Sequence, residues 1–348
     1  MLHNLHLLRA IAALGVVYFH ITSTAGLQLS WDVGSRGVDV FFVISGFIIT
    51  YIGVRRPEHF LRRRLIRIVP FYWAATLIVF AAASALPQFF RSTTADASHL
   101  LYSLFFIPHL NEVTGETLPT LILGWSLNFE MFFYLVFALA LRWGGSWAPL
   151  ISIAAIVAVM AIVSATGATH PTLTFYGRPI VLEFCYGVAA FYAYRACIDR
   201  ASALEGVLAL KWTLVAILVS GFVAIVLLEF HFRDTMPRFL MAGIPAFFIV
   251  LSALLLERLF QLSVRWPVVH WLGEASYIIY LIHPYIVFSV LRLFFKQGPT
   301  TMTATVLLIV FLLALTSVVS LAIHWWFERP IMAFLRRRFL PDGAQASA

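Results

Sequence analysis

Ten apolar stretches, each long enough to cross or nearly cross a bilayer, follow one another along the chain, and they constrain its fold more than any other feature. Hydrophobic residues make up 61% of the 348 residues and charged residues only 11%, and the mean hydropathy is +0.92. These values exclude a water-soluble domain. The sequence therefore predicts an all-α, polytopic transmembrane helical bundle of about ten spans. The stretches cover residues 5–23, 37–54, 66–86, 120–141, 149–166, 178–197, 211–229, 238–257, 269–295 and 302–326.

The distribution of basic residues predicts the orientation of these spans. If residue 1 lies inside the cell, sixteen lysines and arginines fall in the cytoplasmic loops and tail and seven fall on the opposite side. The positive-inside rule then places both termini in the cytoplasm. In so apolar a chain, the net charge of +8 indicates topology rather than nucleic-acid binding. We expect a single transmembrane domain over 1–330, a partly helical outer loop over 87–119, and a short basic, then disordered, cytoplasmic tail over 331–348.

The first stretch also has features of a cleavable signal peptide, because a basic start and a short apolar core precede Ser23-Thr24-Ala25. A histidine at the end of the apolar run is unusual in such a peptide. Removing the segment would also leave nine spans and a less consistent charge distribution. We therefore expect the segment to be retained as the first span.

Arg9 and His20 place two ionisable side chains inside this first span. They are eleven residues apart, close to three helical turns, so both emerge on one face about 16 Å apart along the axis. Ionisable groups are costly inside a membrane, and those retained usually line an interior that serves a substrate path. The spacing therefore predicts that the first helix forms a wall of a functional site.

An arginine cluster precedes the third apolar stretch in FLRRRLIRIVP, residues 60–70. Helical spacing puts Arg63, Arg64 and Arg67 on one face, while Arg62 points elsewhere. Guanidinium groups bind phosphate through paired hydrogen bonds, so this stripe suits a pyrophosphate or a 3′-phosphate. Spacing alone does not decide between this phosphate site and a second interpretation, which it favours equally. In that interpretation the arginines set the topology or bind anionic lipid headgroups.

Two carboxylates inside the spans are candidates to assist a catalytic base. Glu130 lies near the middle of the fourth stretch, with Ser126 and Tyr134 one turn to either side. A lone carboxylate at this depth needs a partner. Glu130 can pair with an intramembrane Arg or His as a structural tie, or it can orient a catalytic base. Asp39 lies just inside the outer end of the second stretch, near the depth of His20, so an Asp–His pair is geometrically allowed.

His283, in LGEASYIIYLIHPY, is a second candidate base, and Pro284 is expected to bend its helix. A histidine inside a span can equally be a hydrogen-bonded packing residue. Glu328 lies at the cytoplasmic end of the last stretch, where it could brace the arginines at 62–67. Further candidate site residues are Trp125, Ser126, Glu183 and Tyr277.

Seven motifs, in order and along nearly the whole chain, give the sequence a wider resemblance. They are LRAIAALGVVYFH, GVDVFFVISGFII, FLRRRLIRIVPFYW, WSLNFEMFFYL, RPIVLEFCYG, LGEASYIIYLIHP and FERP. Together they resemble the acyltransferase-3 family of integral membrane acyltransferases, in particular the short forms that modify bacterial exopolysaccharides and lack a fused SGNH domain. The chain departs from the family pattern at His6, where an acidic residue often precedes the arginine of the first span.

The resemblance implies transfer of an acyl group, most often acetyl, from an acyl-CoA co-substrate such as acetyl-CoA to a hydroxyl of a carbohydrate or cell-surface glycan. It implies a bacterial-type inner membrane location, with no permanently bound cofactor, no metal and no nucleic-acid partner. By the same resemblance, Arg63, Arg64 and Arg67 are expected to bind the CoA phosphates. Arg9 is expected to reach the donor deeper in the bundle, and His20 becomes the leading catalytic residue.

A mechanism follows as a hypothesis. His20 would take the hydroxyl proton as general base, with Asp39 or Glu130 fixing its tautomer. A covalent acyl-histidine intermediate is an open alternative. The alternative function is a transporter or flippase of lipid-linked sugars, although the chain shows no convincing inverted repeat with matched broken helices.

Overall fold

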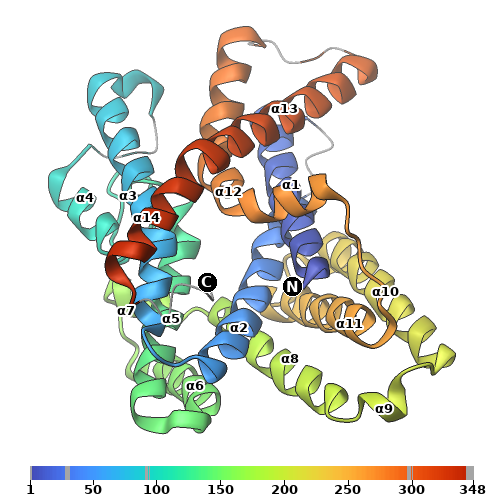
Figure 1. The fold of residues 1–348 in the computed structure, drawn as a ribbon. Helices are drawn as coiled ribbons and strands as arrows, with labels where there is room; N and C mark the ends of the chain where they lie inside the picture. The colour runs from blue at the N-terminus through green and yellow to red at the C-terminus, as the bar shows by residue number, and fades with distance from the viewer. Residues whose placement is uncertain are drawn as a thin grey trace. The chain divides into compact units, whose positions relative to one another are not determined.

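The computed structural model describes residues 2–27, 32–90, 93, 95–295, 299 and 301–341. Within these ranges each predicted apolar stretch falls on a helix, and the predicted all-α membrane fold is confirmed (Figure 1). Nine segments of the described chain are long and apolar enough to cross a membrane, and two of them, Gly124–Thr166 and Met302–Phe339, each hold two α-helices in succession. Arg91 and Lys296, which entered the charge count, and the tail 342–348, expected to be disordered, lie outside the described residues.

The helices form two compact units. The first, Met1–Ile48 with Glu183–Trp326, contains α1 (His3–Thr24), the start of α2 (Gly37–Arg55), nearly all of α8 (Leu182–Ile198), α9 (Ala201–Leu204), α10 (Leu208–Phe232), α11 (Ile244–Phe260), α12 (Pro267–Phe294) and α13 (Met302–Ile323). The second, Ile49–Leu182 with Phe327–Ala348, contains the end of α2, α3 (Phe60–Ala85), α4 (Ala97–Leu104), α5 (Gly124–Gly144), α6 (Ala148–Thr166), α7 (Pro171–Tyr176) and α14 (Arg329–Phe339).

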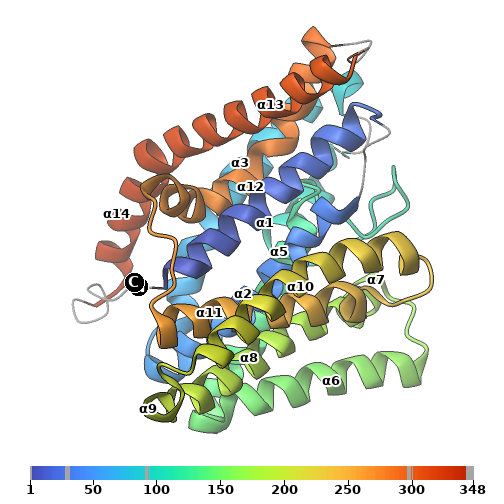
Figure 2. The ribbon, with the colours of Figure 1, turned by 90° about the vertical axis from the view of Figure 1, so that its right-hand side faces the viewer.

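Helices α1, α12 and α13 build the core of the first unit. Figure 2 shows α1 running beside α12, and both contact α13. Small and β-branched side chains dominate their shared surface, so the helices approach closely, as transmembrane helices do where small residues meet. The buried members of this cluster are Ala13, Val17, Ile21, Ala275, Ile279, Val287, Leu291, Leu308 and Leu312.

Glycines allow the closest helix contacts in this unit. A Cβ atom on Gly46 of α2 would overlap the carbonyl oxygen of Phe184, and one on Gly187 of α8 would overlap the carbonyl oxygen of Val43. Helix α2 therefore meets α8 backbone to backbone. This contact holds Asp39, near the start of α2, in the same unit as Glu183.

The first turn of α1 is clamped by a carboxylate from α11. Glu257 accepts the backbone N–H groups of His3 and Asn4, each at 2.7 Å. These are two of the N–H groups that a helix start leaves without intrahelical partners. The Asn4 amide donates to the carbonyl oxygens of Ala253 (2.8 Å) and Leu262 (2.9 Å), so α1 is tied both to α11 and to the segment that follows it.

A π-helical turn, Phe239–Gly243, joins the loop after α10 to α11. Such turns insert one extra residue into the helical ladder and frequently mark functional sites. Gly243 closes the turn against the side chains of Glu183 and Tyr186. The turn begins directly after Arg238, whose side chain is described below.

In the second unit, α4 and α7 are short helices between the long ones. Because α4 lies within the predicted loop 87–119, that loop is partly helical, as expected. Two hydrogen bonds tie α4 to α3. The Tyr72 hydroxyl donates to the carbonyl of Ser103 (3.0 Å), and the Trp73 indole N–H donates to that of Leu104 (2.8 Å). Helices α5 and α6 follow each other directly and pack together.

The basic segment after residue 328 is a helix, α14, rather than an irregular tail. Met332 of α14 and Leu340, the residue directly after it, pack with Ile66 in the second turn of α3. Arg62 of α3 donates to the carbonyl of Phe339 at 3.0 Å, satisfying one of the carbonyl groups that a helix end leaves unpaired. The amphipathic α14 therefore belongs to the fold of the second unit.

Candidate functional site

Two histidines from distant parts of the sequence meet inside the first unit. His20 on α1 and His283 on α12 lie with Nδ1 of His20 3.2 Å from Nε2 of His283, and their rings meet edge to face at a centroid distance of 4.8 Å. His283 is fully buried, whereas His20 is only partly buried. The pair thus has one inner and one accessible member.

Backbone carbonyls fix the tautomer of His283. Its Nδ1 lies 3.0 Å from the carbonyl oxygen of Ile279 and 2.9 Å from that of Tyr280. Carbonyl oxygens only accept hydrogen bonds, so Nδ1 carries the proton and Nε2 of the neutral ring is an acceptor. Pro284 lacks the N–H that would bond to the Tyr280 carbonyl in a regular helix, which leaves that oxygen available to His283.

The same logic fixes the tautomer of His20. Its Nδ1 lies 2.9 Å from the carbonyl oxygen of Val16, so Nδ1 again holds the proton and shares it with Nε2 of His283. The lone pair of neutral His20 is then on Nε2. The sequence singled out both histidines, but only the fold reveals that one orients the other.

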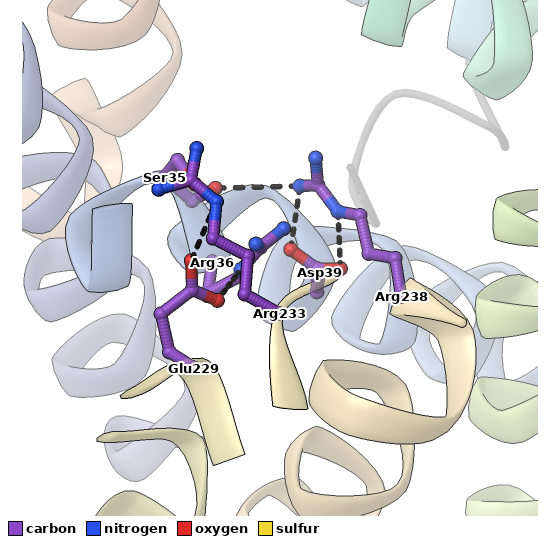
Figure 3. A network of polar contacts seen from close by, with 6 residues as sticks. All are labelled: Ser35, Arg36, Asp39, Glu229, Arg233 and Arg238. Carbon is purple, nitrogen blue, oxygen red and sulfur yellow. Dashed lines mark hydrogen bonds and ion pairs between the residues drawn. The ribbon is translucent and has the colours of Figure 1, made fainter. Parts of the chain in front are cut away.

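Asp39 does not orient His20 in this arrangement. Its fully buried carboxylate binds the guanidinium of Arg238 through two hydrogen bonds, of 2.8 and 2.6 Å (Figure 3). Arg238 also donates to the carbonyl of Ser35 at 3.4 Å. No hydrogen bond among the described residues joins Asp39 to His20, and the carboxylate that depth allowed to pair with His20 pairs with Arg238 instead. A permanently charged guanidinium is the stronger partner for a buried carboxylate.

A second ion pair lies beside the first in Figure 3. Glu229 of α10 binds Arg36 at 2.6 Å and lies 3.9 Å from Arg233. Glu183 is fully buried and lies within electrostatic range of Asp39 and Arg238. Sequence reasoning assigned these arginines to loops and missed their pairing. The available signal was that each stands within a few residues of the end of an apolar stretch.

Arg9 makes a second polar contact between α1 and α12, apart from the histidine pair. Its Nε and one terminal nitrogen donate to the hydroxyl of Ser276, at 3.1 and 2.8 Å. The candidate Tyr277 follows Ser276 and is partly buried. Buried apolar residues such as Ala13 and Ile279 separate this contact from the histidine pair. The predicted polar face of α1 therefore has two polar contacts with an apolar interval between them.

In the second unit, Arg64 turns inward from the predicted arginine stripe. Its guanidinium lies 5.8 Å from the ring centre of Phe60 and 6.0 Å from that of Tyr134. The Tyr134 hydroxyl donates to Oε1 of Glu130 at 2.5 Å, and Glu130 is electrostatically coupled to Arg64. Glu130 thus has partners within its own unit.

The other members of the stripe differ in environment. Arg63 donates to the carbonyl of Arg56 at 2.5 Å, and Arg67 lies within electrostatic range of Arg64 and Arg336. On α5, Ser126 donates to a backbone carbonyl one turn before it (3.2 Å), and Trp125 packs edge-on against a phenylalanine at 6.2 Å. These contacts locate the candidates, and their roles stay predictions.

Comparisons with known proteins identify relatives of this chain. The model of the acyltransferase domain matches residues 2–325. The exopolysaccharide production protein ExoZ of Rhizobium meliloti is 35% identical over 95% of this chain and 99% of its own length. YrhL of Bacillus subtilis, provisionally named a peptidoglycan O-acetyltransferase, is 30% identical over 81% of this chain and 48% of its own.

A further relative, the peptidoglycan O-acetyltransferase OatA of Listeria monocytogenes, is 26% identical over 49% of this chain and 30% of its own. No solved structure matches. The domain match and the likeness to ExoZ each span most of the chain, and they favour an acyltransferase over the transporter alternative. The chain belongs to the acyltransferase-3 family, and the protein is a multi-pass membrane acyltransferase that transfers groups other than amino-acyl groups.

Proposed function

We propose that the protein transfers an acetyl group from acetyl-CoA to a hydroxyl of a bacterial cell-surface glycan, in the inner membrane. The names of its relatives support the acetyl group and the glycan, since they include an exopolysaccharide production protein and peptidoglycan O-acetyltransferases. The observation that carries the proposal is the histidine pair, in which the tautomer of His20 leaves Nε2 as the base.

The reaction balances without a net proton change. Nε2 of His20 takes the proton of the acceptor hydroxyl as its oxygen attacks the thioester carbonyl. The new C–O bond forms, the C–S bond breaks, and the imidazolium returns the proton to the departing thiolate. During this step, the Nδ1–H of the imidazolium has two acceptors, the Val16 carbonyl and Nε2 of His283. Transfer through an acyl group on Nε2 would use the same lone pair.

Donor binding is assigned to the arginines of α3. Arg63, Arg64 and Arg67 lie in its first two turns, where the charge distribution predicts the cytoplasmic side. Guanidinium groups in such a cluster suit the phosphates of CoA. Arg9, held by Ser276, is a further candidate contact for the donor.

The test compares the protein with variants of two histidines. His20→Ala should abolish CoA release from acetyl-CoA in membranes and the acetyl esters on surface glycans, because loss of a general base lowers rates about 10²- to 10⁴-fold. His231→Ala is the matched control. His231 makes the same hydrogen bond to the carbonyl four residues earlier (2.9 Å) but is exposed on α10.

Release of CoA thiol and mass spectrometry of the glycans provide the two measurements. CoA binding by His20→Ala serves as the control for folding. The proposal fails if His20→Ala and His231→Ala show the same near-normal turnover. It also fails if cells lacking the protein keep the full ester content of their glycans.

A further inference from the structure

Helix α14 carries an arginine toward the arginine stripe of α3. Met332 and Arg336 are four residues apart in α14 and therefore share one face of the helix, and Leu340 follows directly after its last residue. Met332 and Leu340 pack with Ile66 of α3, so the face that holds Arg336 is the face turned to α3. Arg336 is accordingly partly buried, while its neighbours Arg337 and Arg338 are exposed.

The contact places like charges together. Arg336 is electrostatically coupled to Arg67 of α3, which repels it, and to Glu328, which attracts it. Because α14 is fixed by its apolar contacts and by the bond from Arg62 to the Phe339 carbonyl, the two guanidinium groups are held near each other by the fold. Like charges held in this way raise the free energy of the protein, and a bound anion lowers it.

The wider cluster has a positive excess. Among the described residues, the arginines of this cluster outnumber the glutamates within electrostatic range of Arg63, Arg64 and Arg336. The arginines are Arg56, Arg63, Arg64, Arg67 and Arg336, and the glutamates are Glu58, Glu130 and Glu328. A preformed excess of guanidinium groups attracts a multiply charged anion, and phosphate oxygens match guanidinium donors in geometry.

We propose that Arg336 binds the acyl donor. Helices α3 and α14 then form one binding site for phosphate groups, and the phosphates of CoA occupy it. This inference rests on the proposed function and adds to it a residue that the sequence assigned to a topological tail. It also gives the C-terminal helix a direct part in substrate binding. Anionic lipid headgroups share the phosphate chemistry, and the experiment separates the two sources.

The test measures CoA affinity of the full-length protein in nanodiscs made only of zwitterionic phosphatidylcholine. Arg336→Ala should weaken CoA binding about 10- to 100-fold, since it removes a charge-assisted phosphate contact. Arg338→Ala, which removes the same charge from the exposed side of α14, should stay within about twofold. Arg336→Gln keeps part of the side-chain stem, so a loss of affinity in this variant as well cannot arise from lost packing.

Arg67→Ala separates this inference from the proposed function. If Arg67→Ala weakens CoA binding while Arg336→Ala matches Arg338→Ala, the inference is wrong and the proposed donor stands. If the unmodified protein binds no CoA, the inference about Arg336 and the proposed CoA donor are both overturned. If Arg336→Ala binds CoA normally but, in nanodiscs that contain phosphatidylglycerol, binds this lipid more weakly than the unmodified protein does, the binding site serves lipid headgroups and the assignment to CoA is refuted.

Discussion

Replacing His283 by alanine tests the role of the histidine pair most directly. The imidazolium that forms on His20 during transfer donates through Nδ1 to two acceptors, the Val16 carbonyl at 2.9 Å and Nε2 of His283 at 3.2 Å. The variant removes one of them. Because the Val16 carbonyl remains, His20 keeps its tautomer, and His283→Ala should impair catalysis less than His20→Ala does.

The size of the effect follows from the bond that is lost. A hydrogen bond to a charged group contributes about 1.5–3 kcal/mol. Each 1.36 kcal/mol changes a rate about tenfold. If the bond strengthens only as His20 becomes charged, kcat should fall roughly 10- to 150-fold. The KM for acetyl-CoA should not change, since neither histidine is assigned to the phosphates.

The assay is CoA release in membranes at saturating acetyl-CoA, with CoA binding as the measure of intact folding. His283→Gln is the informative companion variant, because its amide oxygen can accept the Nδ1–H of His20 and it nearly fills the same space. It should retain activity within about tenfold of the unmodified protein. Equal activity of the alanine and unmodified forms, or a loss in His283→Ala as large as in His20→Ala, would refute the reasoning.

Three further predictions concern orientation, donor binding and the buried ion pair. In a background without the two native cysteines, Arg62→Cys should react with a membrane-impermeant thiol reagent only in inverted vesicles. Labelling in intact cells would show that the predicted orientation and the proposed side of CoA entry are wrong. Arg64→Ala should weaken CoA binding by about 1.5–3 kcal/mol, with partial recovery in Arg64→Lys, and unchanged affinity in a binding assay would return it to a topological role. Asp39→Asn should destabilise the protein by roughly 1–3 kcal/mol because Arg238 loses its carboxylate, and adding Arg238→Gln should restore part of the thermal stability. An additive loss in the double variant would contradict that pairing.

The membrane helices follow from the sequence because their signal is local. Each apolar stretch is long enough to span, and no partner is needed to recognise it. The segment over Arg329–Phe339 escaped recognition as a helix because its arginines were counted for topology. Its apolar positions at Met332, Leu335 and Phe339, after Pro330 in the first turn, were the available signal.

The site was only partly predictable because its decisive contacts are long-range. The eleven-residue spacing correctly put Arg9 and His20 on a surface with polar contacts, yet their partners come from α12, more than 260 residues along the chain. Depth alone made an Asp39–His20 pair allowed, but depth does not identify neighbours. The contact of α2 with α8 and the π-helical turn before α11 place Arg238 beside Asp39, and neither leaves a periodic pattern in the sequence.

The clamp of Glu257 on the first turn of α1 limits how this enzyme can move. Sliding α1 along its axis would break both bonds from His3 and Asn4 and leave a buried carboxylate without donors. Helices α1 and α11 are therefore expected to move together as one rigid element. We expect a motion that admits or releases a substrate at His20 to occur in α12, because its ladder of hydrogen bonds is already interrupted at Pro284, one residue after His283. The hinge of the catalytic cycle and the orienting histidine would then occupy the same helical turn, so that opening the path also disengages the base.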